Sequence, residues 1–241
     1  MSLNPFDQFT VRPLINLSIL EHDISFTNAS LFMMTSVLVI SLFLYLASRN
    51  ASIIPNKLQG AAELLFEFVD NTLTEAAGKS ARVFFPFVFT LFTFLLILNV
   101  SGLLPYGYTV TSQLVITFAL AILVFIAVII TGFIKHGIGF LSMFLPKGTP
   151  IYIAPLMILI ELFSFLVRPI SLCIRLAGNM VAGHVLLKVL GTFAILMGAA
   201  GLLPILFMVI MVGFELFVAI LQAYIFTILT CVYLNDAINL H

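Results

Sequence analysis

Long stretches without charged residues alternate with short polar connections along the first half of the chain. Three of these stretches cover residues 29–47, 83–108 and 110–134. Each approaches or exceeds the ~20 apolar residues that cross the ~30 Å hydrocarbon core of a bilayer. Turn-forming residues at 101–107 separate the second stretch from the third, so these two predict a hairpin. The pattern therefore predicts three conventional membrane-spanning helices.

The connection at residues 57–78 has a different pattern. Apolar residues recur there at helical spacing, which is typical of an amphipathic helix. Four acidic residues lie among them: Glu63, Glu67, Asp70 and Glu75. We expect this helix to lie along the inner membrane surface rather than to cross it. A solvated acidic face is the ordinary interpretation of the carboxylates, and contact with a partner subunit is the alternative.

Beyond Lys147, hydrophobic sequence continues almost to the C-terminus, but polar and charged residues are set into it. Small and turn-forming residues at 198–204 divide this region into two helical segments, residues 150–197 and 203–236. At ~1.5 Å per residue both are longer than a bilayer is thick, so strong tilt is expected. Pro155 and Pro169 are expected to bend the first segment.

Together these elements predict an all-α, polytopic membrane protein. It has three conventional transmembrane helices, one interfacial amphipathic helix and a C-terminal hairpin of two long, tilted helices. The chain divides into an N-terminal outer-side segment at 1–28, the N-terminal membrane helices with the inner-surface helix at 29–147, and the hairpin at 148–241.

The basic residues of the connections predict the orientation in the membrane. Six of them lie between the first two spans or after the third: Arg49, Lys57, Lys79, Arg82, Lys135 and Lys147. Lys and Arg concentrate in short loops on the inner side of membranes. The N-terminus is therefore expected on the outer side and the C-terminus on the inner side. The first 28 residues mix acidic and basic groups, so no cleaved signal is expected.

Composition excludes several classes of function. The chain has 241 residues, of which 62% are hydrophobic and 8% charged, with no net charge, whereas soluble domains have about 25% charged residues. No basic patch is available for nucleic acid. Cys173 and Cys231 form no CxxC or Cys/His cluster, so neither a disulfide, a metal site nor a cofactor is expected. No P-loop or Ser/His/Asp pattern indicates a catalytic site.

Polar residues inside the two long segments are the candidates for function, because an ionisable group in a membrane span is costly and marks a water path, an ion pair or a ligand. At ~100° per residue, one stripe of the first segment has four of them within about 60°: Glu161, Arg168, Arg175 and Asn179. His184 lies about 180° away from Arg175 on the same helix. Glu215 and Gln222 share a face of the last segment.

An antiparallel hairpin brings these residues to matching levels, because the two helices rise equally per residue. Three tiers follow: His184 with Glu215, Arg175 with Gln222, and Glu161 with Asp236. His184 can exchange a proton near neutral pH with help from a carboxylate, whereas Arg175 stays charged. The tiers therefore predict a proton route interrupted by a fixed cation. A moving carboxylate opposite Arg175 has to come from a partner.

Other interpretations stay open. A self-contained secondary transporter predicts internal repeats and paired broken helices, which the sequence lacks. An inert scaffold needs no charged stripe. Each candidate also has a structural alternative, which is strongest for Asn179 and Gln222 as interhelical hydrogen-bonding amides and for Glu161 as a partner of Arg168. Three further basic residues, Arg168, Lys188 and His136, are expected at interfaces, the first two by snorkelling.

Specific motifs carry a family resemblance. The stretch SLCIRLAGNMVAGH at 171–184, LQAYIFTIL at 221–229 and YLNDA at 233–237 closely resemble subunit a of the F-type ATP synthase. LNVSGLLP at 98–105 and the segment at 55–63 extend the resemblance to nearly the whole chain. It implies a stator subunit beside a rotating ring of c subunits, with two offset proton half-channels leading to the ring carboxylates.

The resemblance also implies roles for the candidates. Arg175 matches the indispensable arginine, flanked by Asn179 and Gln222. His184 and Glu215 belong to the outer half-channel, in the order typical of alphaproteobacteria and mitochondria, and Glu161 lies towards the inner one. The implied partners are the c-subunit ring, peripheral-stalk b-type subunits, other ATP synthase subunits and the lipid bilayer. The implied location is an energy-coupling inner membrane, bacterial or mitochondrial, and ATP chemistry occurs on other subunits.

Overall fold

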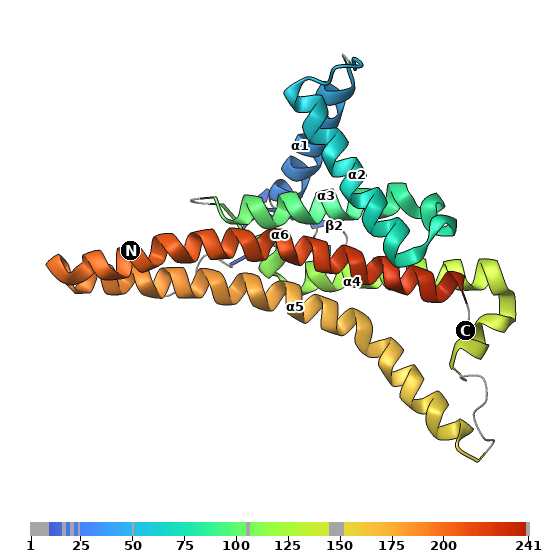
Figure 1. The fold of residues 1–241 in the computed structure, drawn as a ribbon. Helices are drawn as coiled ribbons and strands as arrows, with labels where there is room; N and C mark the ends of the chain where they lie inside the picture. The colour runs from blue at the N-terminus through green and yellow to red at the C-terminus, as the bar shows by residue number, and fades with distance from the viewer. Residues whose placement is uncertain are drawn as a thin grey trace.

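α-Helices account for most of the chain in the computed structural model (Figure 1). The structure describes residues 10–15, 18–19, 22–23, 25–49, 51–104, 107–144 and 152–239. Its helices are α1 (Asn28–Arg49), α2 (Lys57–Ala77), α3 (Phe85–Gly102), α4 (Leu114–His136), α5 (Ala154–Leu196) and α6 (Leu202–Ile238). Short 3₁₀ turns connect them: η2 (Lys79–Phe84), η3 (Val110–Ser112), η4 (Gly137–Phe144) and η5 (Gly198–Gly201).

Four short strands precede α1, and the sequence pattern did not predict them. They are β1 (Pro13–Ile15), β2 (Ser18–Ile19), β3 (His22–Asp23) and β4 (Phe26–Thr27). β1 pairs with β4 and β2 with β3, both antiparallel. The predicted fold class is nevertheless confirmed, because five helices of the described chain are long and apolar enough to cross a membrane.

The predicted elements match the helices except at some ends. α1 and α2 reproduce the predictions at 29–47 and 57–78. The second span was predicted too long, because α3 ends at Gly102. A Cβ atom at Gly102 would lie 2.9 Å from Thr109 Cγ2, so the chain turns back tightly over this glycine. The predictions at 1–9, at 105–106 and at Lys147 lie outside the described residues.

α3, α4, α5 and α6 form a layer of helices that run in similar directions, while α1 crosses this direction steeply (Figure 1). α2 leads from the far end of α1 back onto α3 and α6. Gly78 and Gly137 end α2 and α4 with φ values of 76° and 56°, a conformation that glycine adopts without a steric penalty. The core between the helices is apolar and includes Val69, Leu95, Leu176, Phe226 and Leu234.

α2 packs through only part of the apolar stripe that the sequence indicated. Leu65 and Leu73 lie against the core, whereas Leu58 and Leu64 are exposed. Asp70 forms an ion pair with Arg82, which fixes the end of α2 to η2. The helix is therefore held through its C-terminal half, and its N-terminal half stands away from the layer.

The hairpin of α5 and α6 is longer than a bilayer is thick. α5 has 43 residues and α6 has 37, so at ~1.5 Å per residue they extend ~65 Å and ~56 Å. To fit a ~30 Å hydrocarbon core, α5 must tilt by about 60° from the membrane normal. The 22 residues of α1 extend ~33 Å, a length that fits the same core without strong tilt. The steep crossing of α1 over the layer agrees with this difference (Figure 1).

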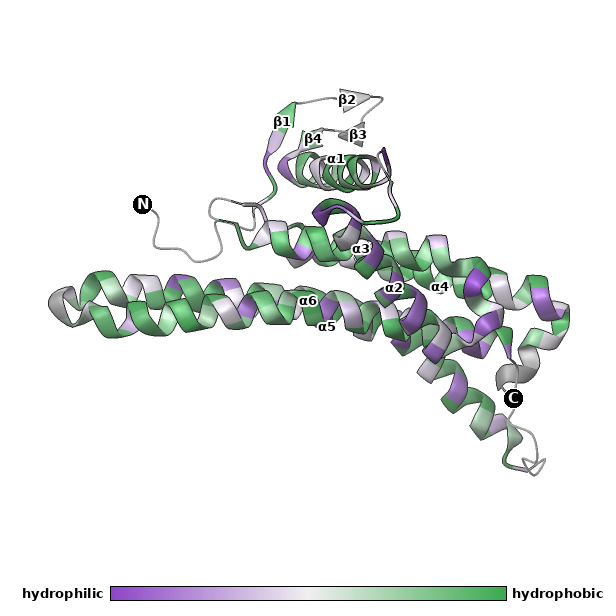
Figure 2. Ribbon diagram, turned by 45° about the horizontal axis from the view of Figure 1, so that its top comes forward, coloured by the Kyte–Doolittle hydropathy of each residue, from purple (hydrophilic) through white to green (hydrophobic). Residues whose placement is uncertain are grey.

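The two prolines of α5 act differently from each other. Pro155 lies in the first turn, where the missing N–H costs nothing, so the expectation that it bends the helix is wrong. Pro169 lies inside the helix, and the N-terminal part of α5 curves away from α6 (Figure 1). Both α5 and α6 are hydrophobic along most of their length, with few hydrophilic positions (Figure 2).

The ends of α4 and α6 lie together. A ring nitrogen of His136 lies 3.0 Å from the carbonyl oxygen of Ile238, so the histidine satisfies one of the last carbonyls of α6. The turn η5 closes the hairpin at the opposite end of α6 (Figure 1). Lys135 and His136 therefore lie at the end of the layer where the C-terminal ends of α4 and α6 meet.

Candidate functional site

His184 of α5 and Glu215 of α6 form a hydrogen-bonded pair across the hairpin. Nδ1 of the imidazole contacts Glu215 Oε1, and Nε2 lies 3.0 Å from the carbonyl oxygen of Gly102 in α3. A carbonyl oxygen only accepts, so Nε2 donates to it and one proton is shared between Nδ1 and the carboxyl group. The pair holds this proton either as imidazolium with carboxylate or as imidazole with carboxylic acid. The predicted contact is confirmed.

Gly183 provides the space that this pair needs. A Cβ atom at position 183 would lie 2.6 Å from Glu215 Oε1 and 2.9 Å from Cδ. Glu215 is only 6% exposed, so it has little room to move away. The glycine next to His184 therefore allows the carboxyl group to approach the imidazole.

Replacing Gly183 by valine is expected to break the pair while the hairpin still forms, because valine has low but sufficient helix propensity. We expect the rate of proton transport by the reconstituted complex to fall about tenfold, the factor that ~1.4 kcal/mol corresponds to. Gly191→Val is the matched control for assembly, because nothing lies within 4 Å of a Cβ atom at that position of the same helix. An unchanged rate with Gly183→Val would contradict the packing argument.

Buried polar residues of the α3–α4 connection surround the end of α3. Thr109, Thr111 and Ser112 are buried, and Ser112 Oγ donates to the Thr109 carbonyl oxygen at 2.6 Å. Burial raises the pKa of the Tyr108 phenol, whose hydroxyl accepts a hydrogen bond from Gln113 Nε2 at 2.8 Å. The His184 end of the hairpin therefore packs against a polar loop, which the sequence pattern treated as a simple turn.

The middle tier differs from its prediction. Gln222 Oε1 accepts a hydrogen bond from Asn179 Nδ2 at 3.1 Å, one turn away from Arg175. Arg175 is exposed, and in the part of the chain that the structure describes no hydrogen bond or salt bridge to its guanidinium is found. Equal level on the two helices therefore does not pair Arg175 with Gln222, because Gln222 bonds to Asn179 instead.

The third tier is organised by Arg168, which the sequence analysis expected to snorkel. Its Nη1 lies 3.2 Å from Asp236 Oδ2 and its Nη2 lies 3.7 Å from Glu161 Oε1. The guanidinium lies 5.0 Å from the centre of the Tyr233 ring and 5.6 Å from that of Phe165. Arg168 is therefore ion-paired within the chain, and the structural alternative for Glu161 as its partner is confirmed as a contact.

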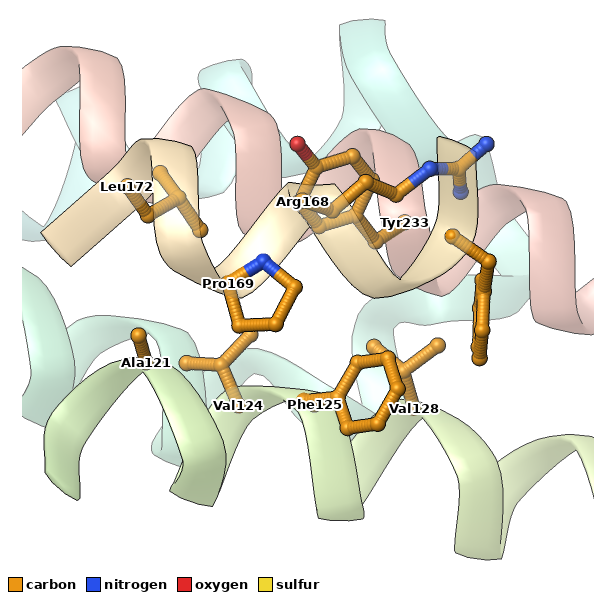
Figure 3. A pocket seen from close by; sticks show the side chains of 9 residues that line it. Ala121, Val124, Phe125, Val128, Arg168, Pro169, Leu172 and Tyr233 are labelled. Atoms are coloured by element: carbon orange, nitrogen blue, oxygen red, sulfur yellow. The ribbon is translucent and has the colours of Figure 1, made fainter. Parts of the chain in front are cut away.

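Apolar side chains enclose the stem of Arg168. Figure 3 shows Arg168 and Tyr233 next to a small pocket between α4 and α5, which Pro169 and Leu172 line from the α5 side. Three α4 side chains that line the same pocket are Ala121, Val124 and Val128. The other residues that line the pocket are uncharged. The guanidinium of Arg168 contacts the carboxylates of Glu161 and Asp236.

All residues of the tiers except Asp236 lie within a stretch that matches a known protein family. The family model for the ATP synthase A chain matches residues 30–235. The chain belongs to the ATP synthase A chain family. It is therefore subunit a of an F-type ATP synthase, a multi-pass membrane subunit of the Fo sector that takes part in proton transport and ATP synthesis. Its partners are other ATP synthase subunits.

One buried residue of this subunit a was missed by sequence reasoning. Asn99 in α3 is completely buried and donates from Nδ2 to the Ala219 carbonyl oxygen of α6 at 3.0 Å. Two buried polar atoms find no hydrogen-bond partner among the described residues. They are Oδ1 of Asn99 itself and Nε2 of Gln222, which lies three positions after Ala219 on α6. A single amide inside a predicted span was the available signal, since such residues join helices in membranes.

Proposed function

We propose that this subunit a provides two offset proton half-channels and an arginine that faces the carboxylates of a rotating c-subunit ring. Proton translocation then drives rotation and ATP synthesis, and ATP chemistry occurs on other subunits. One observation carries the proposal: Arg175 is exposed, while the polar tiers on both sides of it are paired within the chain. A fixed cation in a membrane span that has no ion-pair partner among the described residues suits a carboxylate from outside the chain.

The surface around Arg175 supports contact with a partner helix. Three small residues within about 60° of Arg175 on α5 are exposed: Ser171, Gly178 and Ala182. Small residues let helix backbones approach closely in membranes. Ile174 and Ile170 are also exposed on this part of α5. An apolar face with one cation and small neighbours suits a helix that carries a single carboxylate.

The electrostatics of the cycle follow from these positions. Arg175 favours the ionised form of a ring carboxylate, and lipid favours the neutral form. A proton that enters by way of His184 and Glu215 neutralises the carboxylate after it leaves Arg175. Rotation carries the neutral group through lipid until it releases the proton near Glu161. A membrane potential of 100 mV supplies ~2.3 kcal/mol per proton.

The orientation that we propose rests on the basic connections, and the location rests on the family. The ends of α4 and α6 lie together beside Lys135, and we place them on the inner side of an energy-coupling inner membrane, with the N-terminal segment 1–28 on the outer side. In this arrangement 29–147 anchors the chain and 148–241 translocates protons. Peripheral-stalk b-type subunits hold it against the ring, and the exposed N-terminal half of α2 is available to such a partner.

Disulfide cross-linking tests the ring contact. In a complex with Cys173→Ala and Cys231→Ala, we expect Ile174→Cys to cross-link to a cysteine placed beside the ring carboxylate. Ile174 is 59% exposed, whereas Leu176 is 0% exposed, so Leu176→Cys is the matched control and is expected to give no product. Equal cross-linking of both variants, or of neither, would contradict a ring that docks on this face.

A further inference from the structure

The connection between α1 and α2 presents two isoleucines to the outside of the molecule. Ile53 is 103% exposed and Ile54 is 85% exposed, so neither side chain packs against the described chain. The connection lies at the far end of α1, away from the layer of α3, α4, α5 and α6 (Figure 1). Single exposed apolar residues are ordinary on a protein surface, but two adjacent isoleucines exposed to this extent indicate an apolar partner.

Hydrogen bonds hold this connection in a defined shape. Gln59 of α2 reaches back to Ser52, where its Nε2 donates to the carbonyl oxygen at 2.9 Å and its Oε1 accepts from the backbone N–H at 3.1 Å. Ser52 Oγ donates to the carbonyl oxygen of Ile54 at 2.5 Å. Pro55 restricts the backbone directly after the two isoleucines. The loop is therefore ordered before it meets a partner, which lowers the entropic cost of docking.

The connection lies at the level of a membrane surface. α1 is long and apolar enough to cross a membrane, and it ends at Arg49. At ~3.6 Å per residue or less, Ile53 lies within about 15 Å of Arg49. Tyr45, one turn before the end of α1, is 59% exposed, and tyrosines are enriched where a span meets the lipid headgroups. The two isoleucines are therefore within reach of the acyl chains directly below the headgroups.

Basic residues flank the two isoleucines. Arg49 precedes them, Lys57 follows them, and both basic residues are exposed. Within the described ranges of the chain, neither forms a salt bridge. Anionic lipids give the inner leaflet a negative surface potential that attracts Lys and Arg beside a span. An apolar tip between two cations is complementary to an anionic phospholipid, in which a phosphate group lies above acyl chains.

We propose that the α1–α2 connection docks on anionic phospholipids of the inner leaflet: Ile53 and Ile54 insert between the acyl chains, and Arg49 and Lys57 bind the phosphate groups. The inference rests on the proposed orientation, because it names the inner leaflet, and it does not depend on the proton path. Docking fixes the N-terminal end of α2 at the membrane surface, whereas core packing fixes its C-terminal half.

Quenching by lipids tests the insertion. A bimane fluorophore is attached at Ile53→Cys in a reconstituted whole complex whose other cysteines, Cys173 and Cys231 among them, are replaced. We expect phospholipids with brominated acyl chains to lower its emission at least about twofold, because the side chain lies among those chains. Glu67→Cys is the matched control at an exposed position of α2. Its probe is expected to resist brominated lipids and to be quenched by aqueous iodide.

Headgroup preference tests the two cations. At equal mole fraction, brominated phosphatidylglycerol is expected to quench the Ile53→Cys probe about threefold more strongly than brominated phosphatidylcholine. The double variant Arg49→Gln with Lys57→Gln is expected to lose this preference. Lys79→Gln removes another exposed cation, at the start of η2, and is expected to retain it. All three basic residues are exposed, so we expect these variants to assemble.

Equal quenching of the Ile53→Cys and Glu67→Cys probes overturns the insertion. Equal quenching by the two lipids, or a preference that survives the double glutamine variant, overturns the phosphate contacts. Efficient cross-linking of a photoactivatable group at Ile54 to another subunit also overturns the proposal, because a protein then covers the loop. Arg175→Ala changes neither the loop nor its charges, so transport by that variant would overturn the proposed function and leave lipid docking unaffected.

Discussion

Replacing Arg175 by alanine is expected to abolish coupled proton transport in both directions. The ring carboxylate then has no cation to stabilise its ionised form beside the subunit, so proton exchange loses its bias. A charge-assisted contact of ~3 kcal/mol corresponds to about a hundredfold in rate, and we expect at least this loss. Acid-driven proton flux and ATP-driven pumping in vesicles containing the whole complex measure it.

The control for Arg175→Ala is an exposed apolar residue of another helix. Val115→Ala shortens an exposed side chain of α4 and is expected to leave coupled transport within about twofold, as surface substitutions usually do. ATP hydrolysis by the detached soluble part of the complex should be unaffected in both variants. Transport by Arg175→Ala at the parent rate would make the arginine structural and would refute the mechanism.

Glu215→Ala is expected to cause the second large loss. It leaves the His184 Nδ1 without the carboxyl group that shares its proton, inside a site where Glu215 is nearly buried. We expect proton uptake to fall at least about tenfold, since an unpaired buried polar group costs 1–3 kcal/mol. The measurement is again uptake per assembled complex in vesicles.

Exchanging the two residues tests whether the pair or one position matters. The double variant His184→Glu with Glu215→His keeps one acid and one imidazole, so a shared proton is retained. Its uptake is expected to exceed that of either single replacement, although the contact of His184 with the Gly102 carbonyl oxygen is altered. A double variant no better than Glu215→Ala would show that the pair does not function as a unit.

The helices could be predicted because apolar length is nearly sufficient to define a membrane span. Their ends were harder: the turn-forming residues at 101–107 indicated a turn, but not that α3 ends at Gly102, which Thr109 approaches closely. The lengths of α5 and α6 could be predicted because the apolar sequence on each side of residues 198–204 is uninterrupted. Hydrophobicity was therefore sufficient to predict that these helices exist, whereas the exact residues at which they end depend on tertiary contacts.

For the candidate site, the rise per residue of a helix predicted which residues of α5 and α6 lie at the same level. Equal rise per residue brought His184 level with Glu215, and the two side chains also face each other. The same arithmetic placed Arg175 level with Gln222, but Arg175 faces outward and Asn179 takes the contact. Level is a property of the backbone, whereas pairing depends on side-chain direction.

The contacts of Arg168 were predicted only in part. The seven-residue spacing on α5 indicated Glu161 as a possible partner, whereas the second partner, Asp236, is 68 positions away along the chain. Spacing on one helix cannot show a contact with a residue of another helix.

The distance along the chain between Arg168 and Asp236 also sets an order of events during biosynthesis. A ribosome completes α5 long before it reaches the last turns of α6, so a newly inserted α5 has only Glu161 to compensate Arg168. The second carboxylate arrives only after 68 further residues have been translated. The nascent hairpin therefore gains its second ion pair only once nearly all of α6 has been made, and a chain stopped just before Asp236 would enter assembly without it.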